Sequence, residues 1–137
     1  MQLHASCVSY GTGAVLIRGA SGSGKSALAL ELMALGATLV ADDRTDIALL
    51  DGWPTASAPL AIRGLIEARG VGLLAAEVCV QARVTLVVDL DEIETERLPP
   101  DRATVLLGQK LPLLHKLASP HFAAAILQYL KAGKADR

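Results

Sequence analysis

The chain has few aromatic residues and almost no net charge. Phe, Tyr and Trp make up 3% of its 137 residues, and 13 Lys and Arg face 14 Asp and Glu, for a formal net charge of -1. Proteins whose main partner is a nucleic acid usually present a basic surface or aromatic side chains on which bases stack. The composition therefore argues against nucleic acid as a partner.

Long apolar runs, a signal peptide and closely spaced cysteines are also missing. No uninterrupted apolar stretch approaches the roughly 18 residues that a membrane span needs. The start, Met1 to His4, lacks the basic and apolar regions of a signal peptide. Cys7 and Cys79 form no C-x-x-C pair, which predicts buried free thiols rather than a disulfide or a zinc site. We expect a cytoplasmic protein that does not associate with membranes.

The most informative motif that is present is a complete phosphate-binding loop. It follows the β-branched run Val15–Ile17 and precedes the helix-forming run Ala27–Leu35. In this setting glycines let backbone N–H groups converge on phosphate oxygens, and the positive end of the following helix adds its dipole. The Lys and Ser that close the motif can reach the β- and γ-phosphates and a bound Mg²⁺. The alternative is a turn that carries a Lys by coincidence. The predicted nucleotide-binding residues are Gly19, Ala20, Ser21, Gly22, Ser23, Gly24, Lys25 and Ser26.

The remaining pattern predicts one α/β domain with a partly antiparallel sheet. At 137 residues the chain has room for one domain with a genuine core. A last helix is expected to open at Ser119–Pro120, with Ser as N-cap, and to bury Phe122, Ala125, Ile126, Tyr129 and Leu130. A loop is expected over the charged segment Asp91–Arg102. The predicted strands are Leu3–Val8, Ala14–Arg18, Thr38–Ala41, Ile47–Leu50, Pro59–Leu65 and Val84–Leu90.

Two adjacent carboxylates, Asp42 and Asp43, follow the strand that comes after the phosphate loop. In such a place one carboxylate can orient a metal while the other accepts a proton from an attacking hydroxyl. Neighbouring side chains of a strand point to opposite faces, so the pair can share a site only where the strand has ended. An Asp-Asp turn or a helix cap is the alternative interpretation.

Several further segments are ambiguous when taken singly, but their combination and order along the chain are informative. His4 to Val8 opens the chain, Leu39 to Asp43 reads L-V-A-D-D, Glu67 to Gly72 reads E-A-R-G-V-G, and Glu96 to Leu98 reads E-R-L. Together with the phosphate loop this order resembles the catalytic domain of HPr kinase/phosphorylase, the bacterial enzyme that phosphorylates a serine of the phosphocarrier HPr. The resemblance covers essentially the whole chain. It implies a P-loop domain with a mixed sheet, similar to the nucleotide-binding domains of HPr kinase and PEP carboxykinase.

Carried over to the matching positions, the resemblance implies an ATP- and Mg²⁺-dependent kinase acting on HPr or an HPr-like carrier. Lys25 would stabilise the transferring phosphoryl group, and Asp43, in preference to its neighbour, would be the base. Ser26 and Glu67 would hold Mg²⁺. The full catalytic set that it implies is His4, Lys25, Asp42, Asp43, Arg69 and Arg97.

Two positions admit a second alignment. Ile62–Ile66 also resembles part of the family signature, but Ala61 stands where its Glu belongs, which favours the copy that begins at Glu67. Arg102 competes with Arg97 for the later arginine, and the Leu98 that follows favours Arg97.

The departures from the family also carry information. The chain starts almost at the catalytic domain, so residues 1–137 are expected to form that domain alone, as in short alphaproteobacterial forms, without an N-terminal regulatory domain. Leu114–Pro120 stands where the family has Pro-Val-Arg-Pro-Gly-Arg-Asn, associated with dephosphorylating the product, and lacks both arginines. Kinase activity is therefore expected more strongly than phosphorolysis.

Two other functions stay open: a P-loop kinase acting on a metabolite hydroxyl, and a nucleotide sensor without chemistry. The expected docking surface for a protein substrate is Gly70–Ala76 together with the last helix. A homo-oligomer, the hexamer of the family, is expected.

Overall fold

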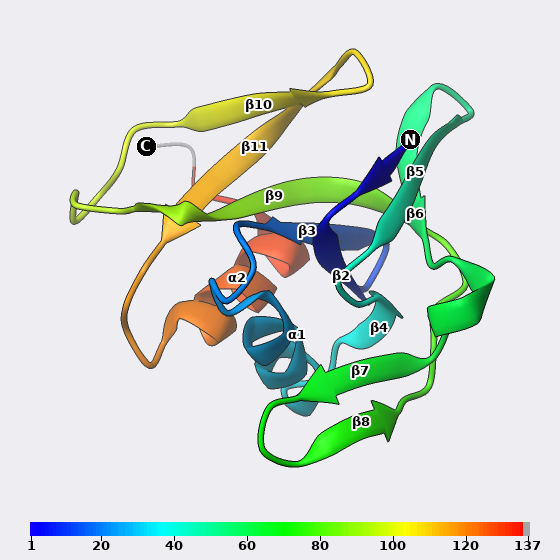
Figure 1. The fold of residues 1–137 in the computed structure, drawn as a ribbon. Helices are drawn as coiled ribbons and strands as arrows, with labels where there is room; N and C mark the ends of the chain where they lie inside the picture. The colour runs from blue at the N-terminus through cyan, green and yellow to red at the C-terminus, as the bar shows by residue number, and fades with distance from the viewer. Residues whose placement is uncertain (136–137) are drawn as a thin grey trace.

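The computed structural model describes residues 1–135 (Figure 1). One curled sheet carries two helices on one face, and a separate two-stranded hairpin stands beside the first helix. The elements in chain order are β1 (Gln2–Leu3), β2 (Ala5–Tyr10), β3 (Gly13–Arg18), α1 (Lys25–Ala34), β4 (Thr38–Ala41), β5 (Thr45–Leu50), β6 (Trp53–Ser57), a 3₁₀ turn (Leu60–Ile62), β7 (Leu65–Ala68), β8 (Gly72–Ala75), β9 (Ala82–Ile93), β10 (Arg102–Leu106), β11 (Gln109–Lys116) and α2 (Phe122–Ala132).

The sheet is mixed, as the sequence predicts. Its strand order is β1-β5-β6-β9-β3-β2-β4, and the β10–β11 hairpin joins it through β11. Strand β9 runs parallel to both β3 and β11, whereas the other neighbours are antiparallel. The long β9 therefore lies directly beside the strand that leads into the phosphate loop (Figure 1).

The core lies on both faces of this sheet because central strands such as β3 are continuously apolar and successive side chains point to opposite faces. Val15 and Ile17 of β3 face the helices, where they join Leu32 of α1 and Ile126 of α2 in one buried cluster. Leu16, between them, faces the opposite side and packs in a second cluster. The two helices hold β3 from one side, which fixes the point where the chain leaves the sheet for the phosphate loop.

Several sequence predictions are confirmed and others are wrong. Helix α1 and strands β3, β4 and β9 lie where they were expected, although β9 extends to Ile93, into the expected loop. Pro59–Leu65 is not a strand: it forms the 3₁₀ turn and leads into β7. Strands β6, β8, β10 and β11 were not predicted. The first expected strand is interrupted at His4, which separates β1 from β2.

The last helix also differs from its prediction. It begins at Phe122, its N-cap is His121, and no side chain in the described part of the chain caps it. Ser119 contributes its carbonyl instead, which accepts the Phe122 N–H. On this helix Ala123 and Leu127 are buried together with Phe122 and Ile126. Ala125 is exposed, while Tyr129 and Leu130 are half-buried.

Both cysteines are free, but only Cys7 is buried. Burial raises the pKa of the Cys7 thiol, which keeps it protonated. Cys79 is half-buried, so the prediction of burial is wrong for this residue. No helix within residues 1–135 is long and apolar enough to cross a membrane.

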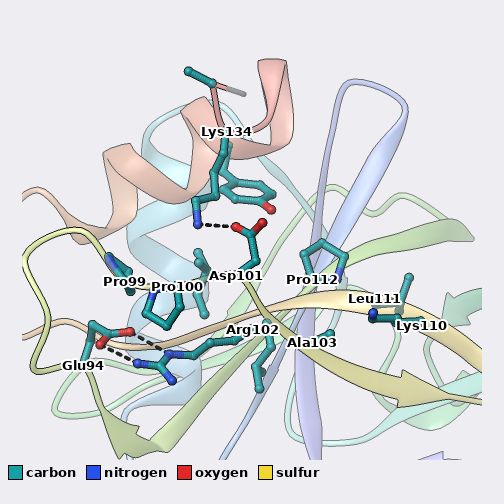
Figure 2. Close-up of a pocket in the computed structure, with 14 residues that line it drawn as sticks. Glu94, Pro99, Pro100, Asp101, Arg102, Ala103, Lys110, Leu111, Pro112 and Lys134 are labelled. Atoms are coloured by element: carbon teal, nitrogen blue, oxygen red, sulfur yellow. Dashed lines mark hydrogen bonds and ion pairs between the residues drawn. The ribbon is translucent and has the colours of Figure 1, made fainter. Parts of the chain in front are cut away.

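Two ion pairs tie the loop between β9 and β10 to its surroundings. Arg102 donates from Nε and Nη2 to the two carboxylate oxygens of Glu94, each at 3.0 Å. Lys134, after α2, donates to Asp101 at 2.7 Å. Both pairs line a cavity of about 550 Å³ between the β10–β11 hairpin and α2 (Figure 2).

The bidentate pair predicts a specific loss of stability in acid. Hydrogen bonds from Arg102, helped by backbone N–H groups of the loop, lower the pKa of Glu94 from 4.5 to about 2. Because the folded pKa lies below the ordinary value, the pair stabilises the fold above pH 4.5 and loses this contribution as the pH falls towards 2. Glu94→Gln should lower the thermal midpoint at neutral pH, and the difference from the wild type should shrink across this range. A difference that stays constant with pH would contradict the assignment.

Candidate active site

The phosphate loop spans the gap between β3 and α1. Gly19 follows β3 and has φ +154°, and a Cβ placed on it would lie 2.6 Å from the Ser23 Oγ. The loop can adopt this conformation only with glycine at position 19. Gly24 is the N-cap of α1 with φ +102°. The first turn of α1 contains no acidic residue of its own, although the Asp42 carboxylate accepts a hydrogen bond from Ser26 in that turn. The glycine-rich loop and the positive end of the helix form a candidate anion site.

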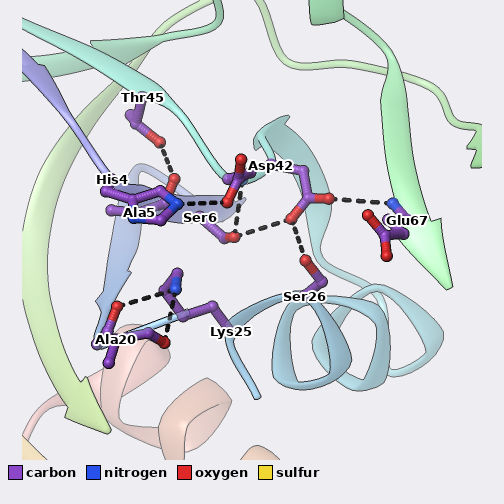
Figure 3. A network of polar contacts seen from close by, with 11 residues as sticks. His4, Ala5, Ser6, Ala20, Lys25, Ser26, Asp42, Thr45 and Glu67 are labelled. Atoms are coloured by element: carbon purple, nitrogen blue, oxygen red, sulfur yellow. Dashed lines mark hydrogen bonds and ion pairs between the residues drawn. The ribbon is translucent and has the colours of Figure 1, made fainter. Parts of the chain in front are cut away.

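Lys25 lies inside this loop. Its side chain is buried, and its Nζ donates to the carbonyls of Gly19 at 2.9 Å and Ala20 at 3.1 Å (Figure 3). An ammonium group has three N–H donors, so one remains for an incoming oxygen. The Ala20 N–H is bound in turn by the Asp91 carboxylate, at 2.9 and 3.0 Å. Asp91 lies in β9, two residues beyond Asp89, where the parallel pairing with β3 ends, and so holds the start of the loop.

Asp42 is the most connected side chain of the site (Figure 3). It is 6% exposed, and its Oδ1 accepts hydrogen bonds from Ser26 Oγ at 2.7 Å and Ser6 Oγ at 2.8 Å. Its Oδ2 accepts the backbone N–H of Glu67 at 3.0 Å. This carboxylate therefore connects α1, β2 and β7 to the end of β4.

Asp43 points elsewhere. It has a left-handed backbone with φ +67°, and its carboxylate, 60% exposed, meets His4 Nε2 at 2.7 Å. Strand β4 ends at Ala41, so the side chains of Asp42 and Asp43 do not have to point to opposite faces of the sheet. The two carboxylates can therefore lie at one site. One is buried and fully hydrogen-bonded, whereas the other is open to an approaching hydroxyl.

The two predicted arginines lie outside this network. Arg69 is exposed in the turn between β7 and β8, and Arg97 is exposed in the loop between β9 and β10. Neither has an ion pair or a side-chain hydrogen bond with another residue of the described part of the chain. Arg102, the alternative to Arg97, is held by Glu94. All three lie in or next to loops, and both exposed guanidiniums are available to a ligand.

A divalent cation would find an incomplete set of protein ligands here. Ser26 offers a hydroxyl beside the Asp42 carboxylate, and Glu67 has an exposed carboxylate on the strand whose backbone binds Asp42. Within residues 1–135 no three or more His, Cys, Asp or Glu side chains form a metal cluster. Mg²⁺ normally uses one or two protein ligands and completes its shell with phosphate and water oxygens, so these residues fit it.

Sequence reasoning missed two residues of this site. Asp91 had a usable signal, because it follows the apolar run Val84–Leu90 and an acidic residue after such a strand is typical of a phosphate site. Ser6 had no usable signal, because a serine on a buried strand is common and its contact with Asp42 exists only in the folded structure.

Comparison with known proteins assigns the chain to a family. The model of the HPr Serine kinase C-terminal domain matches residues 1–111. The chain belongs to this family. The match stops before the segment 114–120 in which the sequence departs from the family pattern.

Individual relatives agree with the family. An HPr kinase/phosphorylase of Exiguobacterium sp. is 38% identical over 118 residues, which cover 77% of this chain and 38% of that protein. The HPr kinase/phosphorylase of Clostridium kluyveri is 48% identical over 65 residues, and that of Lactococcus lactis is 50% identical over 66 residues. Each of these two matches covers 47% of this chain and 21% of the relative. The chain thus spans less than two fifths of the length of these curated relatives.

A solved structure confirms the fold. The HPr(Ser) kinase/phosphatase from Coxiella burnetii superposes with a TM-score of 0.80 at 24% sequence identity, over 96% of this chain and 88% of that one. At this identity the likeness supports the mixed-sheet P-loop fold, and the roles of single residues rest on the geometry described above.

The two aspartates should differ sharply in their effect on stability. Asp42→Ala leaves three donors without their acceptor in a buried place, so the free energy of unfolding should fall by at least about 2 kcal/mol. Asp43→Asn keeps a residue that tolerates the left-handed region and should change it by less than about 0.5 kcal/mol. Urea denaturation of the two variants measures both, and a loss in Asp42→Ala as small as the one expected for Asp43→Asn would show that the buried network does not stabilise the fold.

Proposed function

We propose that this chain is an ATP- and Mg²⁺-dependent kinase that phosphorylates a serine of HPr or an HPr-like phosphocarrier. The observation that carries the proposal is the turn after β4. It places one carboxylate on the phosphate-loop serine and presents the next one, paired with His4, to solvent. Membership of the HPr kinase family supports the substrate class.

ATP binding would use groups of the phosphate loop. Backbone N–H groups of this loop and the N-terminus of α1 would hold the phosphates. The Ala20 N–H, now bound by Asp91, and the Ser23 N–H, now donating to the Ala20 carbonyl, would have to exchange these bonds to take part. Lys25 would exchange its bonds to the Gly19 and Ala20 carbonyls for the γ-phosphate. Ser26 and Glu67 would hold Mg²⁺, which when bound neutralises charge on the phosphate oxygens. Asp42 would keep the Ser26 hydroxyl aimed at this position.

The acceptor serine would enter on the exposed side of Asp43. Its hydroxyl oxygen forms the new bond to the γ-phosphorus while the bond to the β–γ bridging oxygen breaks, and its proton passes to the Asp43 carboxylate. His4 orients that carboxylate through the 2.7 Å contact. Arg69 and Arg97, on exposed loops, would close over the transferring group. This arrangement leaves Asp42 to serve the metal side alone.

Other segments of the chain bear on the reverse reaction and on docking of the carrier protein. The family segment associated with dephosphorylating the product carries two arginines that Leu114–Pro120 lacks, and Lys116 is its one lysine, so we propose a kinase with at most weak phosphorylase activity. Helix α1 lies between the two parts of the proposed docking surface, the segment Gly70–Ala76, which contains β8, and helix α2 (Figure 1). A carrier contacting both would therefore span the helix that begins at the phosphate loop. We propose that the enzyme acts in the cytoplasm as a homo-oligomer.

The proposal is tested by transfer of label from γ-labelled ATP to a purified HPr-type carrier and to its regulatory Ser→Ala variant. Asp43→Asn should lower transfer at least about 100-fold, because the general base is lost, while ATP binding stays intact. Asp46→Asn is the matched control: this acidic residue on β5 contacts Gln2 and lies outside the site, so transfer should be unchanged.

Two results would contradict this function. Undiminished transfer by Asp43→Asn would remove Asp43 as the base. Tight ATP binding by the wild type with label on neither carrier would favour a metabolite kinase or a nucleotide sensor.

A further inference from the structure

The left-handed turn at Asp43 needs support that its own sequence does not provide. A residue with a Cβ at φ +67° is strained, and such conformations persist only where the surroundings hold them. The Arg44 N–H closes the turn by donating to the Asp42 carbonyl at 2.7 Å. The Asp43 N–H has no backbone partner among residues 1–135, because the ladder between β2 and β4 stops at the Cys7–Ala41 pair. Its partner is a side chain.

That side chain is Ser6, the next residue of β2 along the interrupted ladder. It is fully buried, and its backbone is paired with Ile17 of β3 on the other side. Its Oγ accepts the Asp43 N–H at 3.1 Å and donates to Asp42 Oδ1 at 2.8 Å (Figure 3). A single hydroxyl thus holds the backbone of one aspartate and the carboxylate of the other.

We propose that Ser6 is a positioning residue that sets how the two carboxylates diverge. The inference rests on the proposed function, in which Asp42 serves the metal side and Asp43 the acceptor. Ser6 and Ser26 bind the same oxygen of Asp42, so the Ser6 bond fixes the rotation of the carboxylate against which the Ser26 hydroxyl is aimed. Because Ser6 lies on a strand anchored by β3, it transmits the rigidity of the sheet to the site.

Ser6→Ala removes both contacts at once while filling the same buried space. Asp42 keeps Ser26 and Glu67 but can rotate, and the Asp43 N–H loses its acceptor. A hydrogen bond to a charged group is worth enough for roughly a tenfold change or more in an equilibrium or a rate. Two quantities should fall by about that factor: the gain in ATP affinity on adding Mg²⁺, and kcat at saturating substrates.

The matched control is Ser9→Ala. Ser9 is also a buried serine of β2, but its Oγ contacts the Thr38 carbonyl, at 3.4 Å, away from both aspartates. Ser6→Thr restores the hydroxyl and should recover part of the loss. The experiment measures ATP binding by calorimetry with Mg²⁺ and with a chelator, the fold by circular dichroism, and phosphate transfer to the carrier.

The outcomes are separable. A reduced Mg²⁺-dependent gain in Ser6→Ala, with metal-free ATP binding and the fold retained and Ser9→Ala unchanged, supports the positioning role. An unaltered gain in folded Ser6→Ala, an equal loss in Ser9→Ala, or loss of the fold in Ser6→Ala would overturn it. If the wild type transfers no phosphate to the carrier, the proposed function fails, yet the two binding measurements still decide the role of Ser6.

Discussion

The rest of the site depends on the buried carboxylate of Asp42. A charge at 6% exposure is costly unless its oxygens are hydrogen-bonded, and here three donors from three different elements provide those bonds. The phosphate-loop helix, the strand β2 and the hairpin strand β7 are thereby drawn to the end of β4. The requirement to satisfy one charge brings segments that are distant in sequence to the same place.

The carboxylate of the neighbouring Asp43 lies in the opposite environment. Its carboxylate stays largely in solvent and has His4 as partner, so its desolvation cost is small and it remains accessible. The contrast separates two tasks between residues with the same chemistry: one carboxylate organises the loop, and the other faces the surface where an acceptor would arrive. A single left-handed residue, supported by Ser6, makes this separation possible.

Local signals in the sequence predicted the parts of the fold that local chemistry decides. The phosphate loop, the helix behind it and the strand ending at Ala41 follow from glycine spacing and apolar runs. Strands β10 and β11 were missed because most of their residues are only partly buried and owe their conformation to pairing of the two strands with each other and with β9. Pro59–Leu65 was wrongly predicted as a strand because a short apolar run does not distinguish a strand from a 3₁₀ turn. The acidic pair was recognisable, but its geometry depends on Ser6, which becomes a partner only after folding.

The most direct test of this account is a crystal structure with Mg²⁺ and a non-hydrolysable ATP analogue. The triphosphate is expected in the loop of residues 19–26, with Lys25 moved from the Gly19 and Ala20 carbonyls to the γ-phosphate. Ser26 is expected to bind the metal while still donating to Asp42. A nucleotide bound elsewhere, for example in the cavity between the β10–β11 hairpin and α2, or a metal without Ser26 as a ligand, would contradict it.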